Sequence, residues 1–249
     1  MQQGEKDRAM PESEVVRPDA ADAEASAPVK RRGSVVTYML RLAVRAVLDL
    51  GALPFLVMAA LIGRFVPKVI DIGIGPVPII NNKHHKAALE THGYSAEIFI
   101  DTLWFYTKDY DYVATRLMRG PPRVLLPYWL MARSIFRYGT IYTYFDGGPL
   151  RTTAWLYRLE PALFKLARIR TVIMAFGADV HVLTRARDRY FAYAYMRDYP
   201  EHRFIYRRIE NKIALWTFWA DHIITGCDWV NYIPHWDTLM ISHFAIDTK

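Results

Sequence analysis

Cysteine is almost absent from this chain of 249 residues, since Cys227 is the only one. No intramolecular disulfide can form, and no zinc site built from several cysteines can be assembled. Scarce cysteine is typical of a reducing compartment, so we expect a cytoplasmic setting. At roughly 100–200 residues per domain, the length corresponds to one large domain or to one domain with additional segments.

Aromatic side chains are absent from the first 33 residues, which mix acidic, basic and proline residues freely. Such a composition cannot bury enough apolar surface to fold, so residues 1–33 are predicted to form a disordered tail. A secretory signal would place an apolar run directly after a short basic stretch, whereas acidic residues precede the first apolar run here. Export is therefore not expected.

A full-length uncharged apolar run is missing as well. Residues 34–66 are strongly apolar, but their longest uncharged part, residues 50–63, has 14 residues, and a simple span needs about 20. Pro54 interrupts helical hydrogen bonding in this part, and basic residues flank the run on both sides. We predict a helix that dips into or lies on the cytoplasmic face of the inner membrane; a true span and a helix buried on the folded domain are the alternatives.

Basic residues are in excess, and the net charge is +7. This charge suits nucleic acid, a phosphorylated substrate or an acidic membrane surface. Residues 116–137 mix arginine with aromatic residues, which is typical of a headgroup interface or of a packed helix whose arginines face water. Residues 188–208 do the same, but their acidic members and helical spacing favour a packed surface helix, so no nucleic-acid partner is predicted.

From residue 67 onward the pattern alternates between short apolar runs and longer amphipathic stretches. The predicted strands cover residues 68–75, 96–100, 124–126, 139–144, 171–175 and 222–225, and the predicted helices cover residues 79–93, 103–117, 127–137, 153–168 and 189–219. This alternation indicates an α/β domain over residues 67–249, with a parallel sheet covered by helices on both faces. Functional residues of such folds are expected in the loops that follow the strands.

The first of these loops contains Gly73, Gly75 and Pro76. Glycine lets a backbone approach a ligand, and the helix that follows directs its free N–H groups toward an anion. A dinucleotide fingerprint needs a third glycine where Pro78 stands, so NAD is disfavoured. The loop is predicted to bind a phosphate or a sugar; a tight turn without a ligand is the alternative.

His84 and His85 lie one turn into the following helix. Either imidazole could contact a phosphate, but adjacent helical positions face different directions. At most one or two side chains of this segment can therefore point toward the loop. A metal site would need histidines four residues apart, so none is predicted here.

Asp146, Gly147 and Gly148 follow the predicted strand at residues 139–144. They could place a carboxylate and unhindered backbone amides beside a substrate. Asp-Gly is also typical of an ordinary turn, which is the alternative.

Gly177, Asp179 and His181 follow the predicted strand at residues 171–175. This loop is the strongest single candidate, because a glycine, a carboxylate and an imidazole coincide at one strand end. Asp179 could orient a hydroxyl or accept its proton. A capping or turn role is the alternative.

Four segments, taken in order, resemble the N-terminal domain of GT-B glycosyltransferases of the group-1 or family-4-like kind, which assemble bacterial polysaccharides and glycolipids. The resemblance covers residues 68–249 and rests on Gly73 to Pro76, Phe176 to Val180, Trp219 to Gly226 and Ile241 to Thr248. The family has a glycine where this chain has Ala245. The resemblance implies a Rossmann-like sheet.

The resemblance also implies a hexosyltransferase that moves a sugar from a nucleotide-sugar donor to an acceptor hydroxyl, with neither a metal nor another cofactor. It makes Asp179 and His85 the candidate catalytic residues, and it places the loop from Gly73 to Gly75 against the donor phosphates or the acceptor. The family's second domain, which holds most of the donor pocket, would follow this chain, so the chain alone is expected to be a poor catalyst. The apolar helix favours a lipid-linked or carbohydrate acceptor at the membrane.

Two other interpretations stay open. A Rossmann-type oxidoreductase would need the missing third glycine and an acidic ribose-binding residue, for which Asp101 is the nearest candidate. A non-catalytic module could instead dock on the membrane or on a partner protein.

Overall fold

The computed structural model describes residues 35–103, 109–116, 121–200 and 202–240. The chain divides into two units, residues 1–38 and 39–249, and all contacts given below lie within the second. The elements are, in order, α1 (Val35–Gly63), β1 (Ile70–Ile74), α2 (Asn82–Thr91), β2 (Ala96–Ile100), β3 (Tyr112–Val113), η1 (Ala114–Arg116), η2 (Pro121–Leu125), α3 (Leu126–Arg137), β4 (Tyr138–Tyr144), η3 (Leu156–Arg158), α4 (Glu160–Leu166), β5 (Arg170–Met174), η4 (Leu183–Arg185), α5 (Arg189–Asp198), α6 (His202–Trp219), β6 (His222–Thr225), η5 (Cys227–Asn231) and β7 (Thr238–Leu239).

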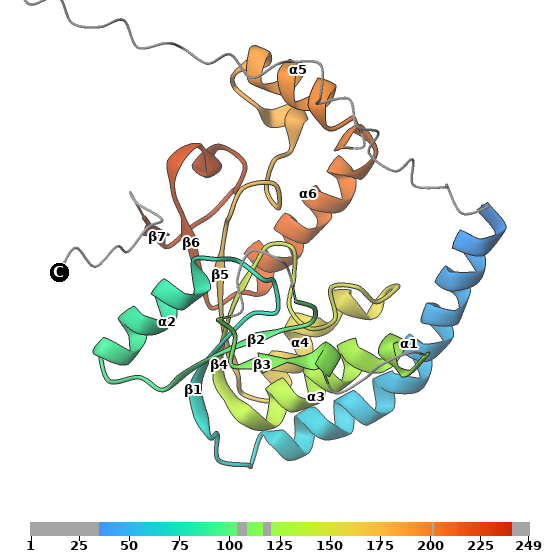
Figure 1. The fold of residues 1–249 in the computed structure, drawn as a ribbon, viewed down its shortest axis with the longest axis vertical. Helices are drawn as coiled ribbons and strands as arrows, with labels where there is room; N and C mark the ends of the chain where they lie inside the picture. The colour runs from blue at the N-terminus through green and yellow to red at the C-terminus, as the bar shows by residue number, and fades with distance from the viewer. Residues whose placement is uncertain (1–34, 104–108, 117–120, 201, 241–249) are drawn as a thin grey trace, which may run out of the picture. The chain divides into compact units, whose positions relative to one another are not determined.

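The strands form one seven-stranded sheet in the order β3-β2-β1-β4-β5-β6-β7, and every pairing is parallel (Figure 1). The chain proceeds from β1 outward to β3, then crosses to β4 and continues outward in the opposite direction. This is the doubly wound, Rossmann-like arrangement, whose direction reverses between β1 and β4. The predicted α/β class is confirmed.

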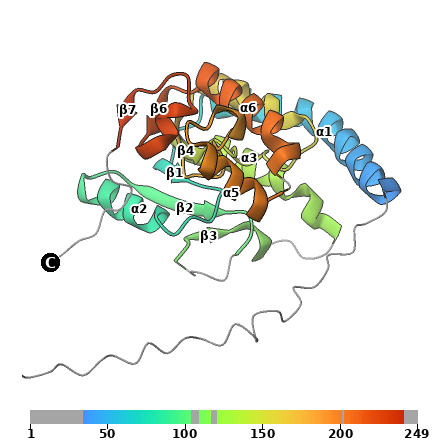
Figure 2. The ribbon, with the colours of Figure 1, turned by 90° about the horizontal axis from the view of Figure 1, so that it is seen from above.

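Both faces of the sheet are packed against helices (Figure 2). Ile98 and Phe99 are neighbours in β2 and therefore point to opposite faces. The core on the Phe99 side includes buried residues of α1, α3, α4 and α6, whereas the core on the Ile98 side is packed by Leu89 of α2. The predicted two-sided covering is confirmed.

Four predicted elements differ from the structure. The predicted helix at 153–168 is a short 3-10 helix, η3, followed by the seven-residue helix α4, with Pro161 at the start of α4. Residues 124–126 form no strand, because η2 runs through Leu125 and α3 begins at Leu126 with Pro127 in its first turn, where proline is tolerated. The predicted helix at 103–117 lies partly outside the described residues, and its described part holds β3 and η1. The predicted helix at 189–219 is two helices, since Pro200 cannot continue the backbone hydrogen bonds of α5.

The apolar helix α1 is fixed to the domain through a buried carboxylate. Asp49 accepts hydrogen bonds from the Tyr128 hydroxyl at 2.6 Å, the Trp155 N–H at 2.8 Å and the Leu156 N–H at 3.1 Å. Leu56 and Ala60, which lie seven and eleven positions after Asp49, are buried on the same side of the helix. One face of α1 therefore belongs to the core.

The opposite face of α1 is apolar and exposed. Val47, Leu50, Phe55 and Met58 have between 57% and 77% of their surface accessible. Among the described residues, one helix is long and apolar enough to cross a membrane, and it comprises the 25 residues Met39–Gly63. The helix thus combines a face packed on the domain with an unpacked apolar face.

Replacement of Asp49 by alanine should lower the free energy of unfolding by about 3 kcal/mol, because it leaves one partly buried hydroxyl and two backbone N–H groups without their acceptor. Urea unfolding of the full chain in mild detergent measures this. Asp198→Ala, which removes a carboxylate of an exposed ion pair, should cost less than about 0.5 kcal/mol. Equal effects of the two substitutions would show that Asp49 does not secure α1.

Candidate functional site

The loops after β1, β4 and β5 lie together at the carboxyl edge of the sheet, on either side of the point where the strand order reverses. Ligands of doubly wound folds bind at this place. The structure brings the predicted loops at residues 73–76, 146–148 and 177–181 to this edge.

The glycines of the first loop are needed for packing. Gly75 has a φ of 153°, and a Cβ there would lie 1.9 Å from the Phe99 carbonyl oxygen of β2. A Cβ at Gly73 would lie 2.6 Å from the Tyr138 ring. The Gly75–Pro76 peptide is cis. Close approach of strands and rings accounts for both glycines, and ligand binding by this loop stays a prediction.

The start of α2 is tied to the sheet. Asn82 is fully buried, donates to the Val77 carbonyl oxygen at 3.0 Å and accepts from the Tyr144 hydroxyl at the end of β4. His84 and His85 are both partly buried, and the His85 ring packs against the Tyr142 ring, with centroids 5.4 Å apart. As adjacent helical residues, the two histidines point in different directions.

Asp179 joins two strand-end loops. Its carboxylate accepts the N–H groups of Phe176 at 3.1 Å and Gly177 at 3.0 Å, both after β5, and of Phe145 at 3.1 Å, after β4. The side chain is 7% exposed, and burial raises the pKa of Asp179 to about 7. Three backbone donors occupy this carboxylate, so the structure shows a role in fixing the loops.

The glycine pair after β4 encloses a second buried acid. Glu160 of α4 accepts the N–H groups of Gly148 at 3.2 Å and Leu150 at 3.0 Å. A Cβ at Gly148 would lie 2.5 Å from a Glu160 carboxylate oxygen, and Gly147 has a φ of 108°. Burial raises the pKa of Glu160 to about 8. The bare amides predicted to face a substrate are thus partly used by an internal carboxyl group.

Asp146 is a partly accessible carboxylate of this edge, with 34% of its side chain exposed. It accepts from Lys212 Nζ at 2.6 Å and Arg151 Nη1 at 2.7 Å, and Arg151 also contacts Asp101 at 2.5 Å. Burial alone would raise the pKa of Asp146, but the adjacent cations Lys212 and Arg151 hold this pKa below its usual value. Asp146 is therefore ionised and rigidly held at neutral pH, which suits it to accept a hydrogen bond from a ligand hydroxyl.

His181 turns away from Asp179 into a ring cluster. Its ring contacts those of Phe191, Tyr195 and Tyr232 at centroid distances of 5.4 to 5.5 Å. Burial lowers the pKa of His181, so the neutral ring is favoured. The cluster holds α5 against the strand-end loop, and a substrate role for His181 stays a prediction.

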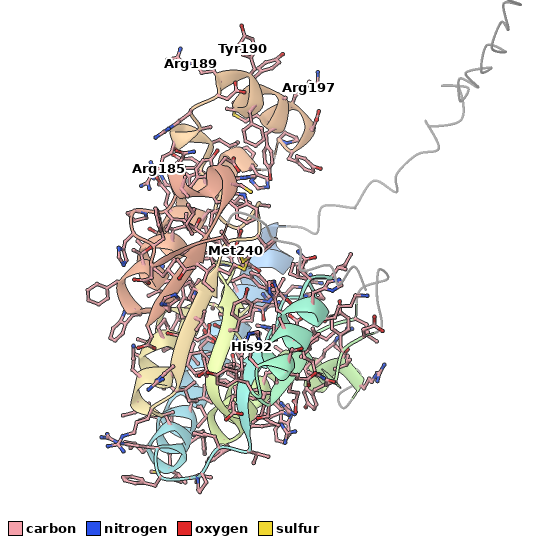
Figure 3. All side chains as sticks on the ribbon, turned by 90° about the vertical axis from the view of Figure 1, so that its left-hand side faces the viewer. His92, Arg185, Arg189, Tyr190, Arg197 and Met240 are labelled. Atoms are coloured by element: carbon pink, nitrogen blue, oxygen red, sulfur yellow. The ribbon has the colours of Figure 1, made fainter. Side chains whose placement is uncertain are left out.

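The basic and aromatic residues of α5 lie outside this edge. Figure 3 shows Arg189, Tyr190 and Arg197 projecting outward from α5, and 88% of the Tyr190 surface is accessible. The helix contains no buried residue. Helix α5, the first half of the predicted packed surface helix, is therefore packed through partly buried side chains alone.

Arg151, Glu160 and Lys212 were not anticipated from the sequence as part of the site. A signal was present, because Lys212 lies on the apolar stripe of α6 with Ile209, Ile213 and Trp216. Glu160 likewise lies four residues after buried Leu156, and Phe164 follows it by four. A charged residue on an apolar helical stripe indicates a buried partner.

No protein-family model, curated protein or solved structure matches the chain. Within the described residues, no group of three or more His, Cys, Asp or Glu side chains is arranged to hold a metal ion. The structure itself defines the class of protein, which is a Rossmann-like α/β domain with one long apolar helix among its described residues.

Glu160 should make stability fall as pH rises. The carboxyl group of Glu160 keeps its proton to about pH 8 in the folded state but releases it near pH 4.5 in the unfolded state. Between these two values the folded state therefore binds more protons than the unfolded state. The free energy of unfolding then decreases as pH rises, by at most about 1.4 kcal/mol per pH unit. Glu160→Gln should flatten this decline in urea unfolding at pH 5 to 8. Glu90→Gln, on the exposed side of α2, should keep the wild-type slope; identical slopes for wild type and Glu160→Gln would contradict the assignment.

Proposed function

We propose that this chain is the acceptor-side domain of a glycosyltransferase that transfers a sugar from a nucleotide-sugar donor to a lipid-linked or carbohydrate acceptor at the cytoplasmic face of the inner membrane. The observation that carries the proposal is a doubly wound sheet joined, in one unit, to a helix whose exposed face is apolar. The sequence resemblance to GT-B N-terminal domains supports the reaction, and α1 supports the location.

In this proposal the carboxyl edge of the sheet orients the acceptor. Asp146, ionised and held by two cations, accepts a hydrogen bond from an acceptor hydroxyl and fixes its direction. Asp179 positions the loops after β4 and β5, because its oxygens are occupied by backbone N–H groups. His85 and His84 lie in the first turn of α2, the helix after β1, where an imidazole can transfer a proton or contact a phosphate. No residue of this chain is assigned to the nucleotide part of the donor.

A non-catalytic binding module is the second candidate. One observation favours it: Asp146, Glu160 and Asp179 are all neutralised or hydrogen-bonded by groups of the chain itself. Such a module would bind the same membrane-linked acceptor without transferring a sugar to it.

Acceptor binding tests the proposal. The full chain should bind nanodiscs that carry a polyprenyl-diphosphate-linked sugar more tightly than nanodiscs without it, and Asp146→Asn should weaken that preference by at least about tenfold, because it removes a charged acceptor of a hydroxyl hydrogen bond. Surface plasmon resonance measures both.

Glu90→Gln serves as the control and should leave the preference unchanged. Equal binding to the two kinds of nanodisc would contradict the proposed acceptor. NADH binding, seen as quenching of tryptophan fluorescence, would favour an oxidoreductase. Acceptor binding that never leads to sugar transfer, even with a donor-domain protein added, would favour the binding module.

A further inference from the structure

A pocket of about 240 Å³ lies between α1, η2, α3 and the loops after β2 and β4. Arg45 of α1 and Arg123 of η2 contribute to its wall, together with Asp101, Thr102 and Thr152 from the loops. Pockets for drug-sized ligands measure roughly 300–1,000 Å³. This one therefore has room for a headgroup-sized moiety and not for a dinucleotide.

The pocket carries two cations, Arg45 and Arg123, and both are exposed to solvent. Over the ranges that the structure describes, neither Arg45 nor Arg123 forms an ion pair. The wall's one carboxylate, Asp101, is already bound to Arg151 at 2.5 Å. The nearby carboxylate of Asp49, one turn from Arg45, accepts its hydrogen bonds from Tyr128 and from two backbone N–H groups. With Asp101 held by Arg151, the guanidinium groups of Arg45 and Arg123 have N–H donors left for an occupant, and the hydroxyl groups of Thr102 and Thr152 are additional donors.

Asp49 fixes the position of Arg45. The two residues are four positions apart and therefore lie on one face of α1, so the hydrogen bonds of Asp49 hold the Arg45 backbone at the pocket. The charge of Arg45 also acts on Tyr128, which lines the pocket. Burial and Asp49 raise the pKa of Tyr128, and the positive charge of Arg45 lowers it in part.

The other side of the same helix is the exposed apolar face. Val47, two positions before Asp49, and Leu50, directly after it, are 70% and 66% exposed. A helix with an apolar face in a bilayer and cations on its opposite side places those cations at headgroup depth. The pocket would then lie where the phosphates of an amphiphile are found.

We propose that this pocket binds the phosphate group of an anionic amphiphile, with the guanidinium groups of Arg45 and Arg123 as its ligands. Arginine suits phosphate because its planar fork donates two parallel hydrogen bonds. The phosphate can be carried by a membrane lipid or be free in solution, and the chemistry of recognition is the same. The proposal rests on the membrane part of the proposed function and not on sugar transfer.

Vesicle co-sedimentation of the full chain tests this site. Phosphatidylcholine vesicles with phosphatidic acid are compared with vesicles that carry oleate at equal surface charge, and the chain should prefer phosphatidic acid. Arg45→Ala and Arg123→Ala should each weaken binding to phosphatidic acid by at least about tenfold, since each removes a charge-assisted contact. Arg41→Ala, one turn before Arg45 and outside the pocket, is the matched control and should cost no more than about fivefold, the effect of one surface cation.

Equal losses in all three variants, or equal binding to oleate vesicles, would overturn the pocket and leave only a basic surface. Displacement from phosphatidic acid vesicles by millimolar inorganic phosphate would show that a free phosphate also fills the site; resistance to displacement, with the variant losses intact, would assign it to the lipid.

Failure of the wild-type chain to bind any vesicle would refute the membrane part of the proposed function instead. The pocket is then tested by inorganic phosphate alone. A rise in melting temperature that Arg45→Ala abolishes would support the site, and no rise in the wild type would overturn it.

Discussion

The buried carboxylate of Asp49 determines how the apolar helix relates to the domain. A carboxylate on an otherwise apolar helix is costly to bury without partners, and here one hydroxyl and two backbone N–H groups supply them. Those partners come from α3 and from the segment that begins η3, so the carboxylate links three parts of the chain. Leu56 and Ala60 then extend the contact along the same face. Because this face is fixed, the opposite apolar face is fixed outward, and Arg45 is fixed beside the pocket.

Ionisable side chains on apolar helices also bind backbone groups at the carboxyl edge of the sheet. Glu160 and Lys212 lie on apolar stripes of α4 and α6, and each reaches the loop after β4. Asp179 performs the corresponding task between the loops after β4 and β5. Ionisable side chains that are hydrogen-bonded to backbone order these loops before any ligand arrives, which lowers the ordering cost of binding. Among the carboxylates that order these loops, Asp146 keeps 34% of its side chain exposed.

Much of the fold could be predicted from the sequence, because periodicity and turn residues act locally. The strands at 96–100, 171–175 and 222–225 match β2, β5 and β6 within a residue or so. The strands β3 and β7 have two residues each, too few for a pattern.

The site was harder to predict than the fold. Its loops are recognisable in the sequence as glycine and aspartate motifs, but the side chains that bind to these loops come from distant helices. Glu160 lies 12 positions after Gly148, and Lys212 lies 66 after Asp146; spacing along the chain carries no signal for such pairs.

The sequence left three possibilities for the apolar helix: lying on the membrane, spanning it, or packing on the domain. The structure shows why the first and third are compatible. A helix that crosses a bilayer must satisfy or expel each polar side chain within the hydrocarbon, whereas Asp49 is satisfied by the domain. The packed face therefore accounts for the charge in the helix, and the exposed face accounts for its apolar length. In the proposed location the exposed face of α1 would contact lipid, while the face that carries Asp49 stays packed on the domain.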